Sequence, residues 1–128
     1  MQRDAPDRTL YAIGDGNTTT PVVVLVDGGT ASAAEVVAAA LQDRSRAVVV
    51  GSRTYGKGSV QEPSVLPDGS AIEFTIGRYL TPAGRLIDGR GVEPDVLVDA
   101  AATPDVAEAR ALEVLRGLTA ALPLTDQG

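Results

Sequence analysis

Two residues of this 128-residue chain, Ser32 and Lys57, are of types that could perform covalent chemistry, and they lie 25 positions apart. The chain has no His and no Cys, which excludes a Ser-His-Asp triad, a thiol nucleophile and His- or Cys-ligated metals. Ten of its 11 basic residues are Arg, which cannot be deprotonated in a protein, and the remaining one is Lys57. Any nucleophile and base must therefore come from hydroxyl groups, carboxylates or this lysine.

Ser32 follows the turn sequence Asp27-Gly28-Gly29 and precedes an alanine-rich stretch of helical composition. Glu35 lies three residues later, which makes a capping box, so one interpretation of Ser32 is a helix N-cap. The other uses the same position, because the unpaired N–H groups of a helix N-terminus can stabilise a developing oxyanion. From the residues alone both interpretations stay open.

Lys57 lies in a glycine-punctuated loop, residues 51–58, that resembles the P-loop pattern. Gly58 stands where that pattern needs a hydroxyl, and the β-branched segment after it contains Pro63, whereas a P-loop opens a helix. Nucleotide binding is therefore a weak alternative. As a general base, Lys57 would need burial in an apolar, glycine-lined pocket to become neutral near pH 7. A single lysine in an Arg-rich chain can also simply reflect base composition.

The elements that would position these residues follow from periodicity and turn signals. Residues 21–26 and 46–50 are apolar without alternation, as in strands covered on both faces. The sequence therefore predicts an α/β (α+β) fold with one sheet layer covered by helices. The predicted strands span residues 9–13, 21–26, 46–50, 59–65, 71–80 and 95–98, and the predicted helices span residues 33–43 and 104–118.

Composition narrows the possible partners. The net charge is −6 at pH 7 with no basic run, so the chain is a poor nucleic-acid binder. Residues 22–26, the longest apolar run near the start, are far too short to cross a membrane. The first eight residues lack the apolar segment of a signal peptide.

Several segments occur together in an order that is similar to the C-terminal processing peptidases of family S41, whose fold resembles the crotonase and Clp-protease core. They are Val26-Asp-Gly-Gly-Thr-Ala-Ser-Ala-Ala-Glu-Val36, Ala39-Ala-Leu-Gln-Asp43, Gly51-x-x-Thr-Tyr-Gly-Lys-Gly-Ser-Val-Gln61, Arg78-Tyr-x-Thr-Pro-x-Gly84 and Gly89-Arg-Gly-Val-Glu-Pro-Asp95. The resemblance implies that Ser32 is the nucleophile, Lys57 the general base, and Gln61 the residue that orients the lysine. It also implies that the backbone N–H of Ala33 is one oxyanion donor, and it implies no metal or cofactor.

The resemblance has departures. Asp27 stands where the family usually has Asn, and a carboxylate near Lys57 would favour the charged lysine. The family's upstream glycine-rich strand, which supplies the second oxyanion donor, and its PDZ-type domain are not visible in this sequence. We therefore expect an N-terminal segment at residues 1–20, an incomplete protease core at residues 21–98, and a C-terminal helix and tail at residues 99–128. We expect the chain alone to be inactive or weak, with its second donor outside it.

The resemblance further implies a polypeptide substrate cleaved near its C-terminus and a bacterial extracytoplasmic location. An uncovered core would favour a homo-oligomer or a strand-exchanged dimer. The alternative function is a non-catalytic peptide-binding or assembly module that retains the family's sheet. Hydrogen-bond contact between the Lys57 Nζ and the Ser32 hydroxyl would favour the enzyme over this alternative.

Overall fold

The computed structural model of the chain describes residues 9–122. Its central sheet has three parallel strands in the order β1-β2-β5, formed by Val23–Val26, Val48–Gly51 and Val96–Leu97. Helix α1, Ala33–Asp43, connects β1 to β2, and helix α2, Pro104–Ala120, follows β5. The predicted α/β class is confirmed, and so are the helix over residues 33–43 and the short edge strand within residues 95–98.

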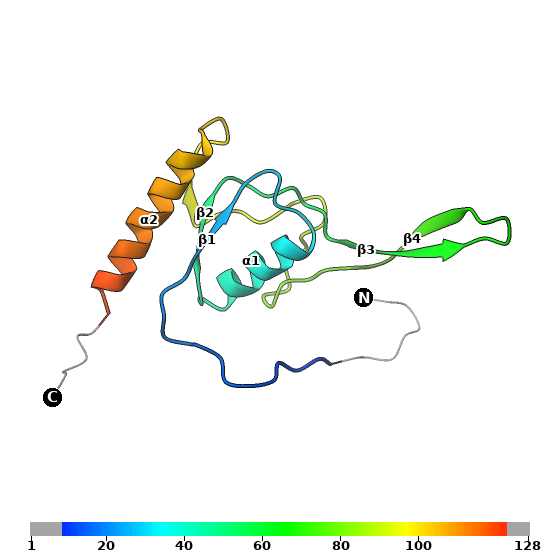
Figure 1. Cartoon of the computed structure of the whole chain (residues 1–128), viewed down its shortest axis with the longest axis horizontal. Helices are drawn as coiled ribbons and strands as arrows, with labels where there is room; N and C mark the ends of the chain where they lie inside the picture. The colour runs from blue at the N-terminus through cyan, green and yellow to red at the C-terminus, as the bar shows by residue number, and fades with distance from the viewer. Residues whose placement is uncertain (1–8, 123–128) are drawn as a thin grey trace.

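Both faces of the sheet are covered, as the apolar runs without alternation predict. Successive strand residues point to opposite faces, and β2 divides its side chains in this way. Val49 packs with Ala38 of α1, whereas Val50 packs with Ala111 of α2. The two helices thus form the outer layers around β2 (Figure 1).

Strands β3, Ser59–Val65, and β4, Ala71–Arg78, form a separate antiparallel hairpin. It projects from the body of the molecule as an arm (Figure 1). The turn predicted at residues 67–69 is confirmed, with Gly69 at φ +85°. The arm exposes apolar side chains, among them Phe74 at 54%.

One predicted strand is wrong. Residues 9–13 have no regular secondary structure, and Leu10, Tyr11 and Ile13 are largely exposed. In the described part of the chain, residues 9–13 have no neighbouring strand to pair with. A segment with β propensity but no pairing strand does not form a sheet. Residues 1–8 and 123–128, which complete the expected terminal segments, lie outside the described part of the chain.

Helix α2 packs on the sheet through Ala111, which shares a cluster with Val50 and Val98. Helix α2 therefore forms the layer that covers one face of the central sheet. No helix in the described range 9–122 is long and apolar enough to cross a membrane.

Candidate active site

Ser32 occupies a strained position between β1 and α1. Its backbone has φ 54° and ψ −119°, a combination that residues other than glycine rarely adopt and that costs on the order of 1–3 kcal/mol. Such strain is held by the surrounding structure and clusters at functional sites. The serine of a nucleophile elbow also lies on a strained strand-to-helix turn, although the sequence spacing here is not that motif.

The turn before Ser32 is closed by Asp27. Its Oδ1 accepts hydrogen bonds from the N–H groups of Gly29 at 2.8 Å and Thr30 at 3.1 Å. The Thr30 hydroxyl in turn accepts from the Asp27 N–H at 3.0 Å. Asp27 therefore has a local structural role, because its side-chain oxygen closes the turn, and the oxygen of an asparagine could accept the same bonds.

Glu35 joins the Ser32 turn to the Lys57 loop. Its side chain is fully buried, and its Oε2 accepts from the Ser32 N–H at 2.9 Å, which is the glutamate half of a capping box. The same Oε2 accepts from the Lys57 N–H at 2.9 Å. The two backbone nitrogens therefore lie no more than twice that distance apart, 5.8 Å, although 25 positions separate the residues in sequence.

The other carboxylate oxygen of Glu35 is also fully used. Oε1 accepts from the Thr54 hydroxyl at 2.5 Å and from the Gly56 N–H at 2.6 Å. Burial raises the pKa of Glu35, but the Thr54 hydroxyl and then the backbone N–H groups of Gly56, Ser32 and Lys57 outweigh it. Together they hold the pKa of this carboxyl below its ordinary value, so it is ionised at neutral pH.

Glycines let the Lys57 loop pack closely against residues 87–92. A Cβ on Gly58 would lie 2.3 Å from the Asp88 nitrogen, and one on Gly91 would lie 2.4 Å from the Thr54 oxygen. The Gly56 carbonyl accepts from the Gly89 N–H at 2.9 Å. The glycine-rich motif near residue 90 therefore supports the lysine loop from behind.

The structure brings some of the predicted site residues together and leaves others apart. The backbones of Ser32 and Lys57 are adjacent, but the Lys57 side chain is exposed. Over residues 9–122 its ammonium group forms no hydrogen bond with Ser32 and no ion pair. In the same range nothing accepts a hydrogen bond from the Ala33 N–H. An oxyanion donor must be free of other acceptors in this way.

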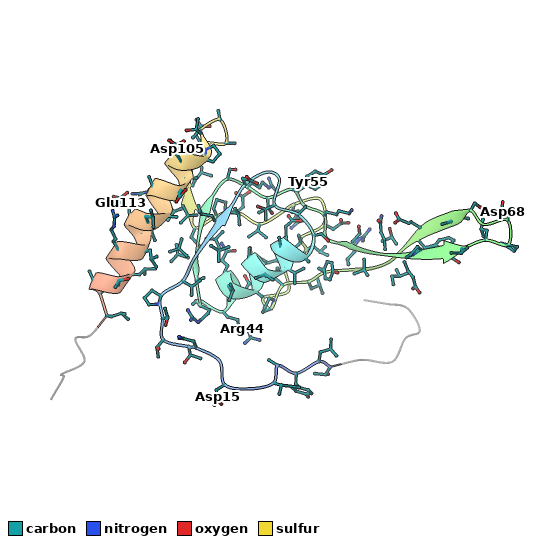
Figure 2. All side chains as sticks on the ribbon, viewed as in Figure 1. Asp15, Arg44, Tyr55, Asp68, Asp105 and Glu113 are labelled. Atoms are coloured by element: carbon teal, nitrogen blue, oxygen red, sulfur yellow. The ribbon has the colours of Figure 1, made fainter. Side chains whose placement is uncertain are left out.

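Gln61 lies on β3, just after an irregularity in the pairing with β4, and is exposed opposite Thr75. No hydrogen bond joins it to Lys57 in the described part of the chain. Contact between the two side chains would require the chain to curl between them, and its role stays a prediction. Figure 2 labels Tyr55 on the lysine loop and Asp68 at the far tip of the arm, so the arm extends away from the loop.

Sequence reasoning missed the wider role of Glu35, and it did not single out Thr54. A usable signal was present, since Glu35 falls within an otherwise Ala- and Val-rich helix. A carboxylate on such a helix needs several donors if it is buried. It also missed the strain at Ser32, which no spacing rule reports.

The P-loop interpretation does not fit the fold, because residues 51–58 lead into strand β3 and a phosphate-binding loop must open a helix. Among residues 9–122, no group of three or more Asp or Glu side chains is arranged to hold a metal ion. The arrangement that remains is a strained serine at a helix N-terminus, beside a lysine on a glycine-walled loop. Serine and lysine are residue types that can act as nucleophile and base when their side chains come within hydrogen-bond reach.

The sequence profile of peptidase family S41 matches residues 1–98. The chain belongs to peptidase family S41. It is 49% identical over 100 residues to the chloroplastic C-terminal processing peptidase of Tetradesmus obliquus, covering 76% of this chain and 21% of that protein. It is 45% identical over 87 residues to the carboxy-terminal-processing protease of Bartonella bacilliformis, covering 68% of this chain and 20% of that protein.

The fold of this S41 chain is also similar to a solved structure of a photosystem II D1 C-terminal processing protease. The TM-score is 0.62 at 47% identity, over 78% of this chain and 25% of that one. The chain thus spans about a fifth to a quarter of the length of these relatives. The predicted family is confirmed, and the match extends further toward the start of the chain than the motifs did.

Proposed function

We propose that this chain carries the nucleophile and base of a Ser-Lys serine endopeptidase that cleaves polypeptides near their C-termini. One observation carries the proposal: a single buried carboxylate oxygen accepts from the N–H groups of both Ser32 and Lys57. That contact fixes two residues, distant in sequence, close enough for the flexible lysine stem to reach the serine hydroxyl. Membership of S41 and the names of the relatives support the reaction class.

In the proposed reaction the Ser32 oxygen attacks the peptide carbonyl carbon, and neutral Lys57 takes the hydroxyl proton. The Ala33 N–H stabilises the negative oxygen of the tetrahedral intermediate. Lys57 then gives the proton to the leaving amine, and water releases the acyl group from Ser32. Gln61 orients the lysine once its exposed side chain turns toward the serine.

The proposal includes little or no proteolysis by the 128-residue chain alone. A missing oxyanion donor costs roughly 10²–10³ in rate, and only one donor is assigned here. Substantial hydrolysis of an unfolded polypeptide, abolished by Ser32→Ala, would show that this part of the proposal is wrong. By resemblance we also propose an extracytoplasmic location for a bacterial source; the relatives include a chloroplastic protein and a bacterial one.

Covalent labelling by a fluorophosphonate tests the Ser-Lys assignment, because this electrophile needs an activated serine but no bound peptide. The chain contains its own control in Ser45, which at φ 51° is the other non-glycine residue with positive φ among residues 9–122. We expect mass spectrometry to find the label on Ser32 and not on Ser45. Lys57→Ala and Lys57→Arg should each slow labelling at least tenfold, since arginine cannot act as a base. Absence of label on Ser32, or labelling independent of Lys57, would contradict the assignment.

A second candidate, a non-catalytic peptide-binding or assembly module, is favoured by the exposed, unbonded Lys57 side chain. It is also favoured by the edge strand β1, where Leu25 is 47% exposed, and by the apolar arm. Such a module would dimerise or bind extended peptides with Ser32 unreactive. Sedimentation analysis together with the labelling experiment separates the two, because only this candidate predicts association that Ser32→Ala and Lys57→Ala leave unchanged while Ser32 stays unlabelled.

A further inference from the structure

Glu35 is a charged side chain with no exposed surface, and its four hydrogen-bond donors come from two separate segments of the chain. Building on the proposed function, we propose that Glu35, held in place by Thr54, is a positioning residue that sets the spacing between Ser32 and Lys57. It contacts neither side chain of the proposed pair through their reacting atoms, so its effect passes through their backbones.

The division of contacts between the two carboxylate oxygens supports this role. Oε2 takes the N–H groups of Ser32 and Lys57, the two residues whose spacing matters, each at 2.9 Å. Oε1 takes the Thr54 hydroxyl and the Gly56 N–H. All four donors are neutral, and three are backbone groups whose directions the chain fixes. A carboxylate whose hydrogen-bond donors have fixed directions has one favourable position. Both loops that donate to it are therefore held in fixed positions relative to each other.

Thr54 fixes the orientation of the carboxylate. Its hydroxyl oxygen accepts from the Val92 N–H at 2.7 Å, so its own hydrogen is free to point at Glu35. The backbone repeats the link, since the Thr54 N–H donates to the Val92 carbonyl at 3.2 Å. Thr54 is buried between helix α1 and residues 87–92. Residues 87–92 therefore hold Thr54 in place against Glu35.

The geometry makes a prediction that does not depend on reactivity. An amide hydrogen lies about 1.9–2.0 Å from its acceptor, so two amides that share one oxygen have hydrogens within about 4 Å of each other. The amide protons of Ser32 and Lys57 should therefore give a direct nuclear Overhauser contact in the 128-residue chain. The Tyr55 N–H also donates to the Thr30 carbonyl at 2.9 Å and joins the same two loops, but Glu35 is the group to which both amides themselves donate.

The test compares four variants by this contact and by fluorophosphonate labelling of Ser32. Glu35→Gln presents an NH₂ group to two of the N–H donors, and Thr54→Val removes the hydroxyl. Thr54→Ser keeps the hydroxyl and should therefore keep both the Ser32–Lys57 contact and the labelling rate. Thr81→Val is the matched control, because Thr81 is also a buried threonine, and its hydroxyl accepts from the Arg85 N–H at the other end of α1.

We expect Glu35→Gln and Thr54→Val to lose the Ser32–Lys57 contact and to label at least tenfold more slowly, while amide spectra show that they remain folded. Thr54→Ser and Thr81→Val should keep both properties. The proposal is overturned if both disruptive variants keep the contact, if they label as fast as an unaltered chain whose Ser32 does label, or if Thr81→Val loses the contact equally. Should the contact follow this pattern while Ser32 never labels, the positioning role stands and the catalytic assignment fails.

Discussion

The two ends of helix α1 each hold a largely buried carboxylate, and they hold it in different ways. At the first turn, Glu35 is surrounded by one hydroxyl and three backbone N–H groups. At the last, the Asp43 carboxylate pairs with the half-exposed guanidinium of Arg85 and accepts from the Ala83 N–H at 2.9 Å. Neutral donors alone hold the carboxylate at the first end, whereas at the other end a mobile cation is added to the Thr81 hydroxyl and the Ala83 N–H.

The difference separates stabilisation from positioning. A long cation that reaches from solvent satisfies a carboxylate over a range of placements. Backbone N–H groups and a hydroxyl that is itself hydrogen-bonded do not, so they determine where the loops lie. The end of α1 that needs only stability has the tolerant arrangement, and the end that carries Ser32 has the rigid one.

The largest expected effect contrasts the removal of each carboxylate. Glu35→Ala leaves three backbone N–H groups and the Thr54 hydroxyl without an acceptor in a closed interior, and should reduce the free energy of unfolding by about 3–5 kcal/mol. Asp43→Ala leaves a cation that water can reach and should cost about 1–2 kcal/mol. Urea denaturation measures both, and equal costs would contradict the distinction between the two ends.

A smaller effect is expected from the loops that each carboxylate holds. Gly91→Ala places a Cβ about 2.4 Å from the Thr54 carbonyl oxygen at φ +70°, so the backbone behind the site must shift. Gly84→Ala, in the loop beside Asp43, also has positive φ, +79°, but meets nothing within 4 Å. We expect losses of about 3 kcal/mol and about 1 kcal/mol respectively.

The glycine pair also carries its own control, because both positions have similar backbone angles and only the space around them differs. Thermal unfolding of the two variants measures the contrast. A Gly91→Ala variant as stable as Gly84→Ala would mean that residues 87–92 do not pack tightly against Thr54. These residues would then not hold Thr54 in place against Glu35.

The same contrast explains what could be predicted from the sequence. Apolar periodicity predicted α1, the buried parallel strands and the hairpin, because those patterns record which face is buried. It failed at residues 9–13, where β propensity has no pairing strand. The capping box was predictable because Ser32 and Glu35 are three residues apart. The contacts from Glu35 to Thr54, Gly56 and Lys57 were not, since they span 19 to 22 positions and exist only after β2 places the loop.

The site shows the same limit. Residue types made Ser32 and Lys57 candidates, the resemblance to family S41 gave them roles, and the fold brings their backbones together. Side-chain approach between the lysine, the serine and Gln61 depends on rotamers and on whatever covers the exposed Lys57, which no spacing rule encodes. The strain at Ser32 likewise arises from closure of the turn onto the helix. The backbone preferences of serine alone would not predict these dihedral angles.

The smallest expected effect is in the acid dependence of stability. The Thr54 hydroxyl and the backbone donors keep the pKa of Glu35 below its ordinary value despite burial, which raises it. The pKa of Asp43 is also lowered, by the Thr81 hydroxyl first, against burial, and then by Ala83 and Arg85. A carboxyl with a lowered folded-state pKa stabilises the fold above its unfolded value, about 4, and loses that contribution as the pH falls through the folded value.

Glu35→Gln and Asp43→Asn should therefore each lose less stability than the unaltered chain as the pH falls from 7 to 3. Salt then separates the two ends. Because Arg85 is half-exposed, 1 M NaCl should reduce the cost of Asp43→Asn at pH 7 by a few tenths of a kcal/mol, about the worth of a surface pair. The cost of Glu35→Gln should not change, because its donors carry no net charge and lie out of reach of ions. Equal salt sensitivity, measured by urea denaturation, would mean that the Glu35 carboxylate depends on a cation after all, most directly the ammonium of Lys57.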